Sequence, residues 1–326
     1  MLAHRLLTSV VVLASSMLCS GFADAKESPE DKSKPLIEAA AKRSLFHTDV
    51  NHPFSVTLAV AIHVAKGGIL SGNYIWIMNP GGDWYRETSF SNYKDVQRGR
   101  GQNIWTKRSV DFMPLQEVLI EKAFSQHIYL DHIDVPVKRY FSTSHHHVTL
   151  QCIEWKNANT LCFDSEGNLR KSELSDFRIT YDYSDYRPAG VKYAPYKIVA
   201  TRDGQMLLEA NIESLSTQND QVLPEPGPDA FQRPGCLMPS QPKAKQKVAP
   251  QYPTGAREQH QQGHVIVAVR IGTDGMVRNP VVIQTAGKDL DFASLAAIKQ
   301  WSFEPAKCGD LPVEFEDAMQ VNFEIR

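Results

Sequence analysis

The residues best suited to chemistry are three consecutive histidines, His145-His146-His147. Successive residues of a strand face opposite sides of a sheet, so only His145 and His147 could act together. A zinc site would need a further ligand, and the nearest candidates are Asp164 and Glu166 on the next hairpin arm. We therefore interpret the run as a surface cluster and expect no metal site. A zinc-dependent or other hydrolase that uses these side chains is the alternative.

A second group of titratable residues is Asp131 and Asp134 around His132. Acid and base catalysis needs a nucleophile or substrate group beside the pair, and the sequence places none there. We interpret the group as a solvated turn. The sequence thus predicts no catalytic residue, no cofactor and no enzymatic activity.

Four cysteines follow the first 25 residues, and an even number favours disulfides in an exported protein. Cys152 and Cys162 are symmetric about Asn157, so a hairpin would place them opposite each other on two strands. Cys236 and Cys308 then form the second pair, which closes a loop of about 70 residues worth about 4 kcal/mol on the loop-entropy model. Four unpaired thiols are the alternative. Zinc binding is disfavoured because the sequence has no Cys-x-x-Cys motif.

The first 25 residues have the pattern of an export signal. His4-Arg5 is basic, Leu6 to Leu18 is apolar, and Ala23-Asp24-Ala25 is a cleavage site of the A-x-A type. We expect cleavage before Lys26 and a periplasmic protein. Two alternatives are lipidation at Cys19, which lacks the small preceding residue that lipidation favours, and an uncleaved inner-membrane anchor.

Length and composition indicate more than one domain. The chain has 326 residues, of which 42% are hydrophobic and 22% charged, which is ample for two cores. A net charge of −2, with scattered Lys and Arg, argues against nucleic acid as a partner. We predict a lead segment over 26–52, a β-rich domain over 53–217, a proline-rich linker over 218–250 and a C-terminal domain over 251–326.

The predicted β-rich domain consists of short strand-like segments separated by turn sequences such as Asn79-Pro80-Gly81-Gly82. Its one clear helical pattern runs from Pro114 to Ser125, with apolar residues at helical spacing. We therefore expect a curved antiparallel sheet covered by a helix. Trp76, Trp84 and Trp105 lie on the strand segments, where large aromatics usually pack between sheet and helix.

The last 75 residues have the most regular pattern. Thr254 can cap a short helix that ends at Gln261, and His264 to Ile271 alternates as a strand. Asp274-Gly275 is a hairpin turn, a helix covers Leu290 to Lys299, and a last strand covers Met319 to Ile325. The order is helix, hairpin, helix and strand, so the final strand is free to lie at a sheet edge.

This C-terminal segment resembles the C-terminal domain of the TonB family. The resemblance covers about 248–326 and rests on these residues: Tyr252-Pro253, Ala256, Gly263, Val265, Val267, Asp274-Gly275, Leu290-Asp291, Ala296-Ala297 and Trp301-x-Phe303-x-Pro305-Ala306. The family's role, as the resemblance implies, is to grip periplasmic partners such as outer-membrane transporters by adding their extended segment to a sheet edge. The candidate partner-binding residues are Tyr252, Val321, Asn322, Phe323, Glu324 and Ile325. Val265, Val267, Trp301 and Phe303 are expected to build the core.

The spaced aromatics of the β-rich domain, from Tyr74-x-Trp76 through Trp84-Tyr85-Arg86 to Trp105, resemble the half-barrel architecture of LolA/LolB-like lipoprotein carriers. The resemblance implies a concave face that can hold an apolar ligand, with Trp76, Trp84 and Trp105 as candidate lining residues. Packing of the three tryptophans in the core is the competing interpretation.

Together these features predict an α+β fold with a half-barrel-like sheet domain and a small TonB-like domain of two helices on an antiparallel sheet. The predicted function is that of a periplasmic binding protein that docks extended partner segments by strand addition. The alternatives are a membrane-anchored TonB-type energy transducer and a lipid or lipoprotein carrier. The exposed final strand also permits a homodimer through edge pairing.

Overall fold

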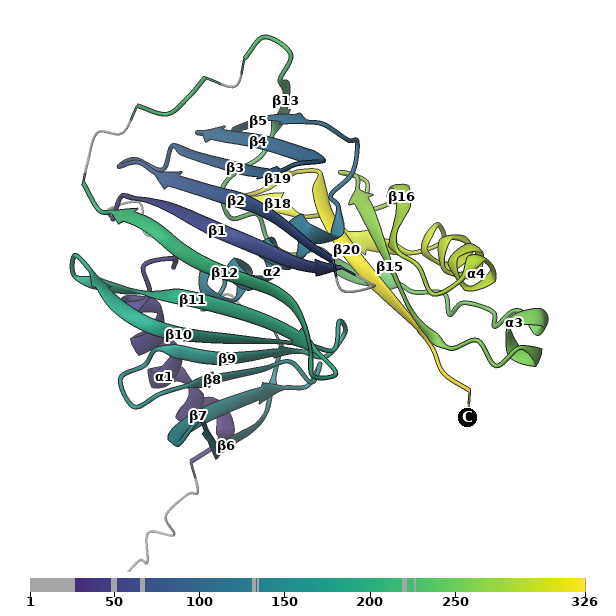
Figure 1. The fold of residues 1–326 in the computed structure, drawn as a ribbon, viewed down its shortest axis with the longest axis horizontal. Coiled ribbons are helices and arrows are strands. Elements are labelled where there is room, and N and C mark those ends of the chain that lie inside the picture. The colour runs from purple at the N-terminus through teal and green to yellow at the C-terminus, as the bar shows by residue number, and fades with distance from the viewer. Residues whose placement is uncertain are drawn as a thin grey trace, which may run out of the picture.

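The computed structural model describes residues 27–47, 52–64, 68–130, 133, 135–218, 222–225 and 227–325. The expected export signal with Cys19 lies outside these residues, as do Asp131, His132 and Asp134. The described chain forms a broad curved sheet and a smaller C-terminal part that packs beside it (Figure 1).

The broad sheet is antiparallel and has thirteen strands. In chain order they are β1 (Phe54–Val64), β2 (Gly68–Met78), β3 (Trp84–Phe90), β4 (Tyr93–Arg100), β5 (Asn103–Arg108), β6 (Val137–His145), β7 (Val148–Trp155), β8 (Thr160–Phe163), β9 (Leu169–Leu174), β10 (Ile179–Ala189), β11 (Lys192–Arg202), β12 (Gln205–Ser216) and β13 (Phe231–Pro234). Their order in space is β13-β5-β4-β3-β2-β1-β12-β11-β10-β9-β8-β7-β6. Strands β1 and β12, distant in sequence, therefore join the two halves of the sheet.

The inward face of this sheet forms the main core. In β1, Phe54, Val56 and Leu58 alternate with half-buried residues, as expected for a strand with one buried face. Helix α2 (Leu115–Ile128) packs on this core through its apolar stripe, which includes Val118. It ends three residues later than the sequence pattern indicated.

Helix α1 (Pro29–Arg43) lies within the predicted lead segment, for which we expected no element. Its N-terminus has a capping box: the Ser28 hydroxyl accepts from the Asp31 amide, and the Asp31 carboxylate accepts from the Ser28 amide. Pro29 occupies the first helical position, where its missing N–H costs nothing.

The C-terminal part has two short helices and several short strands. They are β14 (Lys243–Gln246), α3 (Thr254–Glu258), β15 (Gly263–Ile271), β16 (Val277–Gln284), α4 (Lys288–Ile298), β17 (Ser302–Glu304), β18 (Lys307–Cys308), β19 (Leu311–Pro312) and β20 (Phe315–Phe323). They form a three-stranded antiparallel sheet in the order β16-β15-β20 and two two-stranded sheets, β14-β17 and β18-β19.

The structure confirms the large antiparallel sheet domain but is richer in sheet than the predicted fold class. We expected an α+β protein, but most of the described chain is antiparallel sheet, and four helices occur among the described residues. In the C-terminal part, α3 ends at Glu258 rather than Gln261, and Pro253 occupies its cap position without a side-chain hydrogen bond, so Thr254 is not the cap. The last strand also begins at Phe315 rather than Met319, because it pairs with the whole of β15.

Gly275 is required by the turn between β15 and β16. Its φ is 78°, and a Cβ at this position would lie 1.9 Å from the Phe303 carbonyl oxygen. The Phe303 amide donates to the Gly275 carbonyl at 2.9 Å. The hairpin turn predicted at Asp274-Gly275 thus also anchors the chain that follows α4.

The segment expected as a proline-rich linker, 218–250, is attached to both parts of the molecule. Strand β13 extends the broad sheet by pairing with β5, and β14 pairs with β17 of the C-terminal part. Between these strands, Cys236 is bonded to Cys308. The segment therefore does not run free between the two parts.

The three-stranded sheet is apolar on both faces. Val265, Val267 and Phe323 belong to the core of the C-terminal part, under α3 and α4. Ile266 and Ala318, on the other face, belong to the core of the broad sheet. The two cores therefore meet across β15 and β20, which fixes one part of the molecule against the other.

Candidate partner-binding site

Strand β20 lies at the edge of its sheet. Its register with β15 pairs Val265 with Val321 and Gly263 with Phe323. Among the described residues, no strand pairs with its other edge. An edge strand carries backbone N–H and C=O groups that can pair with another chain.

The side chains predicted to bind a partner do not share one environment. Val321 and Phe323 are only 5% and 2% exposed, and Phe323 meets Tyr252 edge to face at a ring distance of 5.4 Å. Asn322 and Glu324 are exposed, and Ile325 is half-buried. The side chains of Val321 and Phe323 therefore hold the strand in place, whereas those of Asn322 and Glu324 are exposed to solvent.

Tyr252 contributes to packing and to the end of α3. Its ring contacts Phe323, and the Arg257 guanidinium lies 5.3 Å from the ring centroid. Its hydroxyl donates a hydrogen bond to the Gln261 carbonyl. Tyr252 thus packs against the face of β20 that belongs to the C-terminal core and does not line the free edge of the strand.

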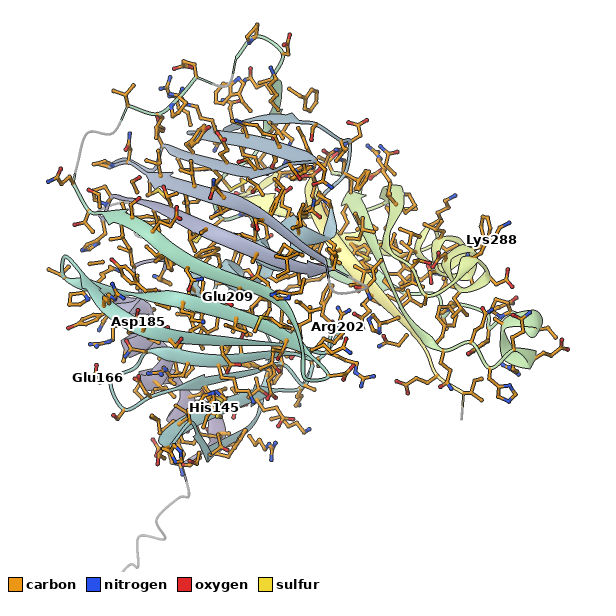
Figure 2. The ribbon with its side chains drawn as sticks, viewed as in Figure 1. His145, Glu166, Asp185, Arg202, Glu209 and Lys288 are labelled. Atoms are coloured by element: carbon orange, nitrogen blue, oxygen red, sulfur yellow. A yellow bond between two sulfur atoms is a disulfide. The ribbon has the colours of Figure 1, made fainter. Side chains whose placement is uncertain are left out.

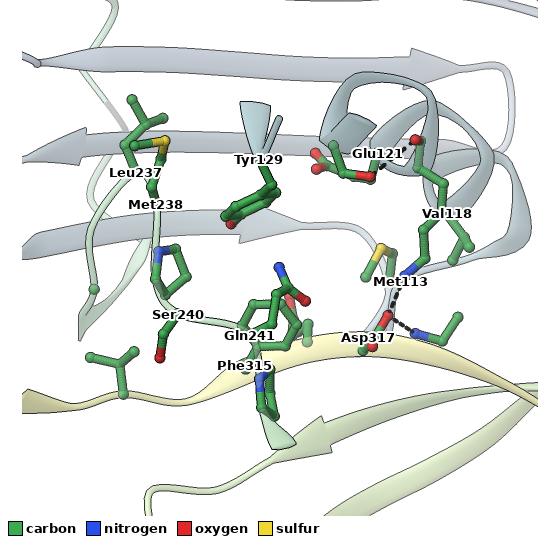
Figure 3. Close-up of a pocket in the computed structure, with 18 of the residues that line it drawn as sticks. Met113, Val118, Glu121, Tyr129, Leu237, Met238, Ser240, Gln241, Phe315 and Asp317 are labelled. Carbon is green, nitrogen blue, oxygen red and sulfur yellow. Dashed lines mark hydrogen bonds and ion pairs between the residues drawn. The ribbon is translucent and has the colours of Figure 1, made fainter. Parts of the chain in front are cut away.

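A large cavity lies beside β20. It has a volume of about 830 Å³ and is enclosed by α2, the inner face of the broad sheet, residues 235–243 and residues 313–318 (Figure 3). Met113 and Val118 come from the α2 side, Leu237 and Met238 from the segment after β13, and Phe315 from β20. The volume is within the range of ligand-binding pockets in proteins.

Ion pairs cross from the broad sheet to the C-terminal part at this cavity. Lys122 of α2 donates to Asp317 of β20 at 2.7 Å. Arg108 of β5 donates to Glu316 at 3.0 Å and to Asp95 at 3.1 Å, and Glu117 of α2 lies 3.7 Å from the same guanidinium. The Arg108 group and its carboxylate partners are almost fully buried, so these pairs are weakly screened, whereas Lys122 and Asp317 are partly exposed.

The carboxyl groups in this network have opposite pKa shifts. Burial raises the pKa of Glu117 well above its usual value, and the charge of Asp95 adds to the effect. Burial also acts to raise the pKa of Glu316, but Arg108, Arg233 and Arg270 outweigh it and hold that pKa below its usual value. Glu316 is therefore the ionised carboxylate that joins the two parts, whereas the environment of Glu117 favours its protonated form.

A second polar contact joins the two parts at the far end of β15. Arg202, at the end of β11, lies between the broad sheet and the C-terminal part (Figure 2). Its Nη1 is 2.6 Å from Nε2 of His264 and 3.0 Å from the Gln284 amide oxygen. Because a guanidinium only donates, His264 Nε2 accepts and the ring is neutral. Nearby, Arg178 lies 3.6 Å from Glu324.

The three tryptophans proposed as lining residues lie in three different places. Trp76 is buried in the main core, where it stacks with Phe46 at a ring distance of 5.9 Å. Trp84 lines the cavity, and the Arg86 guanidinium lies 4.5 Å from the Trp76 ring and 5.2 Å from the Trp84 ring. Trp105 is half-buried and follows the cavity residue Ile104, so it points to the other face of β5.

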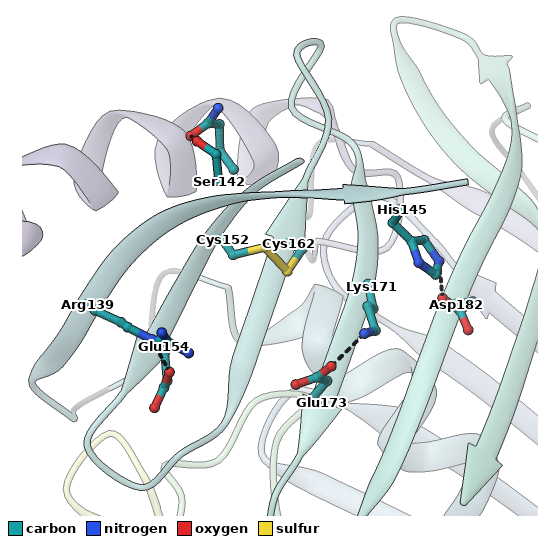
Figure 4. Close-up of a disulfide and its surroundings, with 10 residues drawn as sticks. Arg139, Ser142, His145, Cys152, Glu154, Cys162, Lys171, Glu173 and Asp182 are labelled. Atoms are coloured by element: carbon teal, nitrogen blue, oxygen red, sulfur yellow. Dashed lines mark hydrogen bonds and ion pairs between the residues drawn. A yellow bond between two sulfur atoms is a disulfide. The ribbon is translucent and has the colours of Figure 1, made fainter. Parts of the chain in front are cut away.

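The structure pairs the cysteines as the sequence suggested. Cys152 and Cys162 face each other across β7 and β8, with Cα atoms 4.1 Å apart (Figure 4). Cys236 and Cys308 have Cα atoms 5.9 Å apart and join the segment after β13 to β18.

The histidine run lies at the β6–β7 turn and does not assemble a metal site. His145 Nε2 is 2.8 Å from Asp182, whereas His146 and His147 have positive φ angles in the turn. Asp164 is engaged in its own hairpin, where it accepts from the amides of Glu166 and Asn168. In the part of the chain that the structure describes, no three metal-ligating side chains come together.

Sequence reasoning proposed a concave face lined by Trp84, which does line the cavity, but it did not find the residues that bridge the cavity. Lys122 and Asp317 are far apart in the chain, as are Arg108 and Glu316. The available signal was the unbroken apolar run Val265 to Val269, which is typical of a strand buried on both faces.

No helix among the residues with described coordinates is long and apolar enough to cross a membrane.

Comparison with known proteins supports the C-terminal resemblance. Residues 248–325 match the family described as Gram-negative bacterial TonB protein C-terminal. The chain is 34% identical over 77 residues to Protein tonB2 of Pseudomonas aeruginosa, a match that covers 21% of this chain and 28% of that relative. The chain therefore spans less than a third of the length of the curated relative it matches.

Similar solved structures are distant. A LolA superfamily protein from Nitrosomonas europaea has a TM-score of 0.40 at 10% identity, over 58% of this chain and 94% of that one. A putative outer membrane lipoprotein-sorting protein domain from Vibrio parahaemolyticus has a TM-score of 0.38 at 13% identity, over 58% and 95%. On the sequence match, the C-terminal part, residues 248–325, is similar to the C-terminal domain of TonB proteins.

Proposed function

We propose that this chain is a binding protein of the bacterial envelope, and that its TonB-like part docks an extended segment of a partner protein along the free edge of β20. The observation that supports this proposal is the position of β20, which pairs with β15 on one side only. Main-chain hydrogen bonds would supply affinity, and exposed side chains such as Asn322 and Glu324 would supply selectivity. An outer-membrane transporter is the first partner to test, because TonB-like domains serve transport across that membrane.

In this proposal the chain is not an enzyme and acts in the periplasm after cleavage before Lys26. The attachment of the 218–250 segment supports a periplasmic protein over a membrane-anchored transducer. A transducer needs a long free linker to reach from one membrane to the other. Here β13, the Cys236–Cys308 bond and β14 hold the segment against the protein.

Site-specific photocrosslinking in the native host tests the docking proposal. A photoreactive amino acid is placed at Asn322 or Glu324, and crosslinked proteins are identified by mass spectrometry. The same residue at Val191, which is 82% exposed in the β10–β11 turn, is the control. We expect one envelope protein to be crosslinked from 322 and 324 and not from 191. Equal products from all three positions would place the docking site elsewhere.

A further inference from the structure

The cavity beside β20 has an unusual wall. The first four residues of β20, Phe315 to Ala318, all line it, although successive residues of a strand point to opposite faces. A strand can present every residue to one space only when its backbone edge, rather than one of its faces, borders that space. The opposite edge of β20 is occupied by β15. The edge of β20 from Phe315 to Ala318 that no strand pairs with therefore borders the cavity (Figure 3), although the Ala318 amide already donates to Asp317 Oδ1 at 2.8 Å.

The wall opposite this edge is one face of α2. Val118, Glu121, Lys122 and Ser125 line the cavity at the spacing of a single helical face. Met113, Leu237 and Met238 add apolar surface at its sides. Methionine side chains are flexible and adapt to bound groups of different shape. The cavity thus joins a backbone edge to an adaptable apolar surface.

We propose that this cavity binds an extended peptide whose backbone pairs with Phe315–Ala318 and whose apolar side chains pack on α2 near Val118. The inference rests on the proposed function, because it extends docking along β20 from the exposed end at Asn322 into the space between the two parts. It also assigns part of the binding site to α2 and to residues 235–243.

The polar groups of the cavity favour a peptide over a purely apolar ligand. Glu121, Gln241 and the Lys122–Asp317 pair line it together with the backbone of β20. A hydrocarbon chain would shield these groups from water without replacing their hydrogen bonds, which costs free energy. A peptide backbone supplies the donors and acceptors that the strand edge needs.

Affinity selection from a library of short, end-blocked synthetic peptides on the full chain tests the proposal. Ser125, half-buried on the cavity side of α2, is changed to tryptophan to fill the cavity. Gln116→Trp, at a half-buried α2 position outside the cavity, is the matched control. We expect the selected peptides to carry alternating apolar side chains and to bind Ser125→Trp at least about tenfold more weakly than the wild type or Gln116→Trp. Circular dichroism confirms that both variants are folded.

Hydrogen exchange of the wild-type complex locates the bound peptide. Added protection of amides within Phe315–Asp317, relative to the free chain and lost in Ser125→Trp, supports the inference; the Ala318 amide is left out because it already donates to Asp317. Protection confined to residues 320–325, with equal affinity in both variants, overturns it and leaves the proposed function intact. Failure of the wild-type chain to retain any peptide also overturns it, while crosslinking from 322 still tests the proposed function separately. A copurifying acyl lipid seen by native mass spectrometry in place of peptide binding would identify a lipid site instead.

Discussion

Arg108 Nη1 lies 3.0 Å from Glu316 Oε1. This ion pair joins the end of β5, in the broad sheet, to β20, the last strand of the chain. Only 7% of the Arg108 side chain and 14% of the Glu316 side chain are exposed. Breaking a buried pair by removing one partner is costly because the other charge stays buried and unpaired. We therefore expect this pair to contribute to the junction of the two parts, together with the core shared across β15 and β20.

Replacing Arg108 with methionine should lower the free energy of unfolding by about 3–5 kcal/mol. The loss arises because Asp95 and Glu316 would keep their buried charges without the shared guanidinium. Urea denaturation measures the change. Arg100→Met is the control, since Arg100 is exposed and its pair with Asp83 should be worth at most about 1 kcal/mol. Equal effects of the two substitutions would show that the Arg108 network does not stabilise the fold.

Acidification should weaken the contact between Arg202 and His264. Burial lowers the pKa of His264, and the positive charges of Arg202 and Arg178 lower it further. A histidine with a depressed folded-state pKa contributes stability above its unfolded pKa of about 6.5, and this contribution is lost as the pH falls through the folded value. We expect the stability of the wild type to fall more steeply from pH 7 towards pH 5 than that of His264→Gln. Parallel curves for the two proteins would contradict the assignment.

Gly275→Ala should destabilise the C-terminal part strongly. The substitution combines left-handed strain with a collision against the Phe303 carbonyl, at a cost of about 3 kcal/mol or more. Gly204→Ala is a matched control, because Gly204 has a φ of 79° with open space around it and should cost only about 1–2 kcal/mol. Thermal unfolding of both variants measures the difference. Similar losses would mean that contact with Phe303 is unimportant.

The two disulfides should differ in what their removal exposes. Cys236→Ser with Cys308→Ser opens a loop of sequence separation 72 and should cost about 4 kcal/mol, whereas the Cys152–Cys162 bond, of separation 10, should contribute about 3 kcal/mol. Limited proteolysis distinguishes them better than total stability. We expect new cleavage within 237–250 when Cys236 and Cys308 are replaced by serine, and no new cleavage there when Cys152 and Cys162 are replaced by serine. Resistance of that segment in both variants would show that β13 and β14 hold it without the bond.

Local signals in the sequence predicted the elements of the C-terminal part. The Asp274-Gly275 turn, the alternating strand before it and the helical spacing after Leu290 each depend on neighbouring residues, and each is present in the structure. The symmetry of Cys152 and Cys162 was a local signal of the same kind. In contrast, the capping box at Ser28 and Asp31 was a clear helix start that we overlooked.

Contacts between distant segments could not be predicted in the same way. Ile266 and Ala318 belong to the core of the broad sheet. The sequence of β15 and β20 indicates that both faces of these strands are buried, but it does not indicate which segment covers each face. The antiparallel sheet of the first domain was predicted, but the α+β class understated how much of the chain is sheet, since the thirteen-stranded sheet is assembled from distant segments. The cavity arises from four segments, none of which has a motif of its own.

The Cys236–Cys308 bond also determines how mechanical force would travel through the protein. Force applied to β20 acts on the chain that follows Cys308. The disulfide transmits this force to Cys236 and then to β13, which is paired with β5. The covalent path from the last strand to the broad sheet therefore bypasses residues 237–307, including β15, β16 and α4. Force applied to β20 would therefore reach the thirteen-stranded sheet through a covalent path that does not include the β15–β16 hairpin.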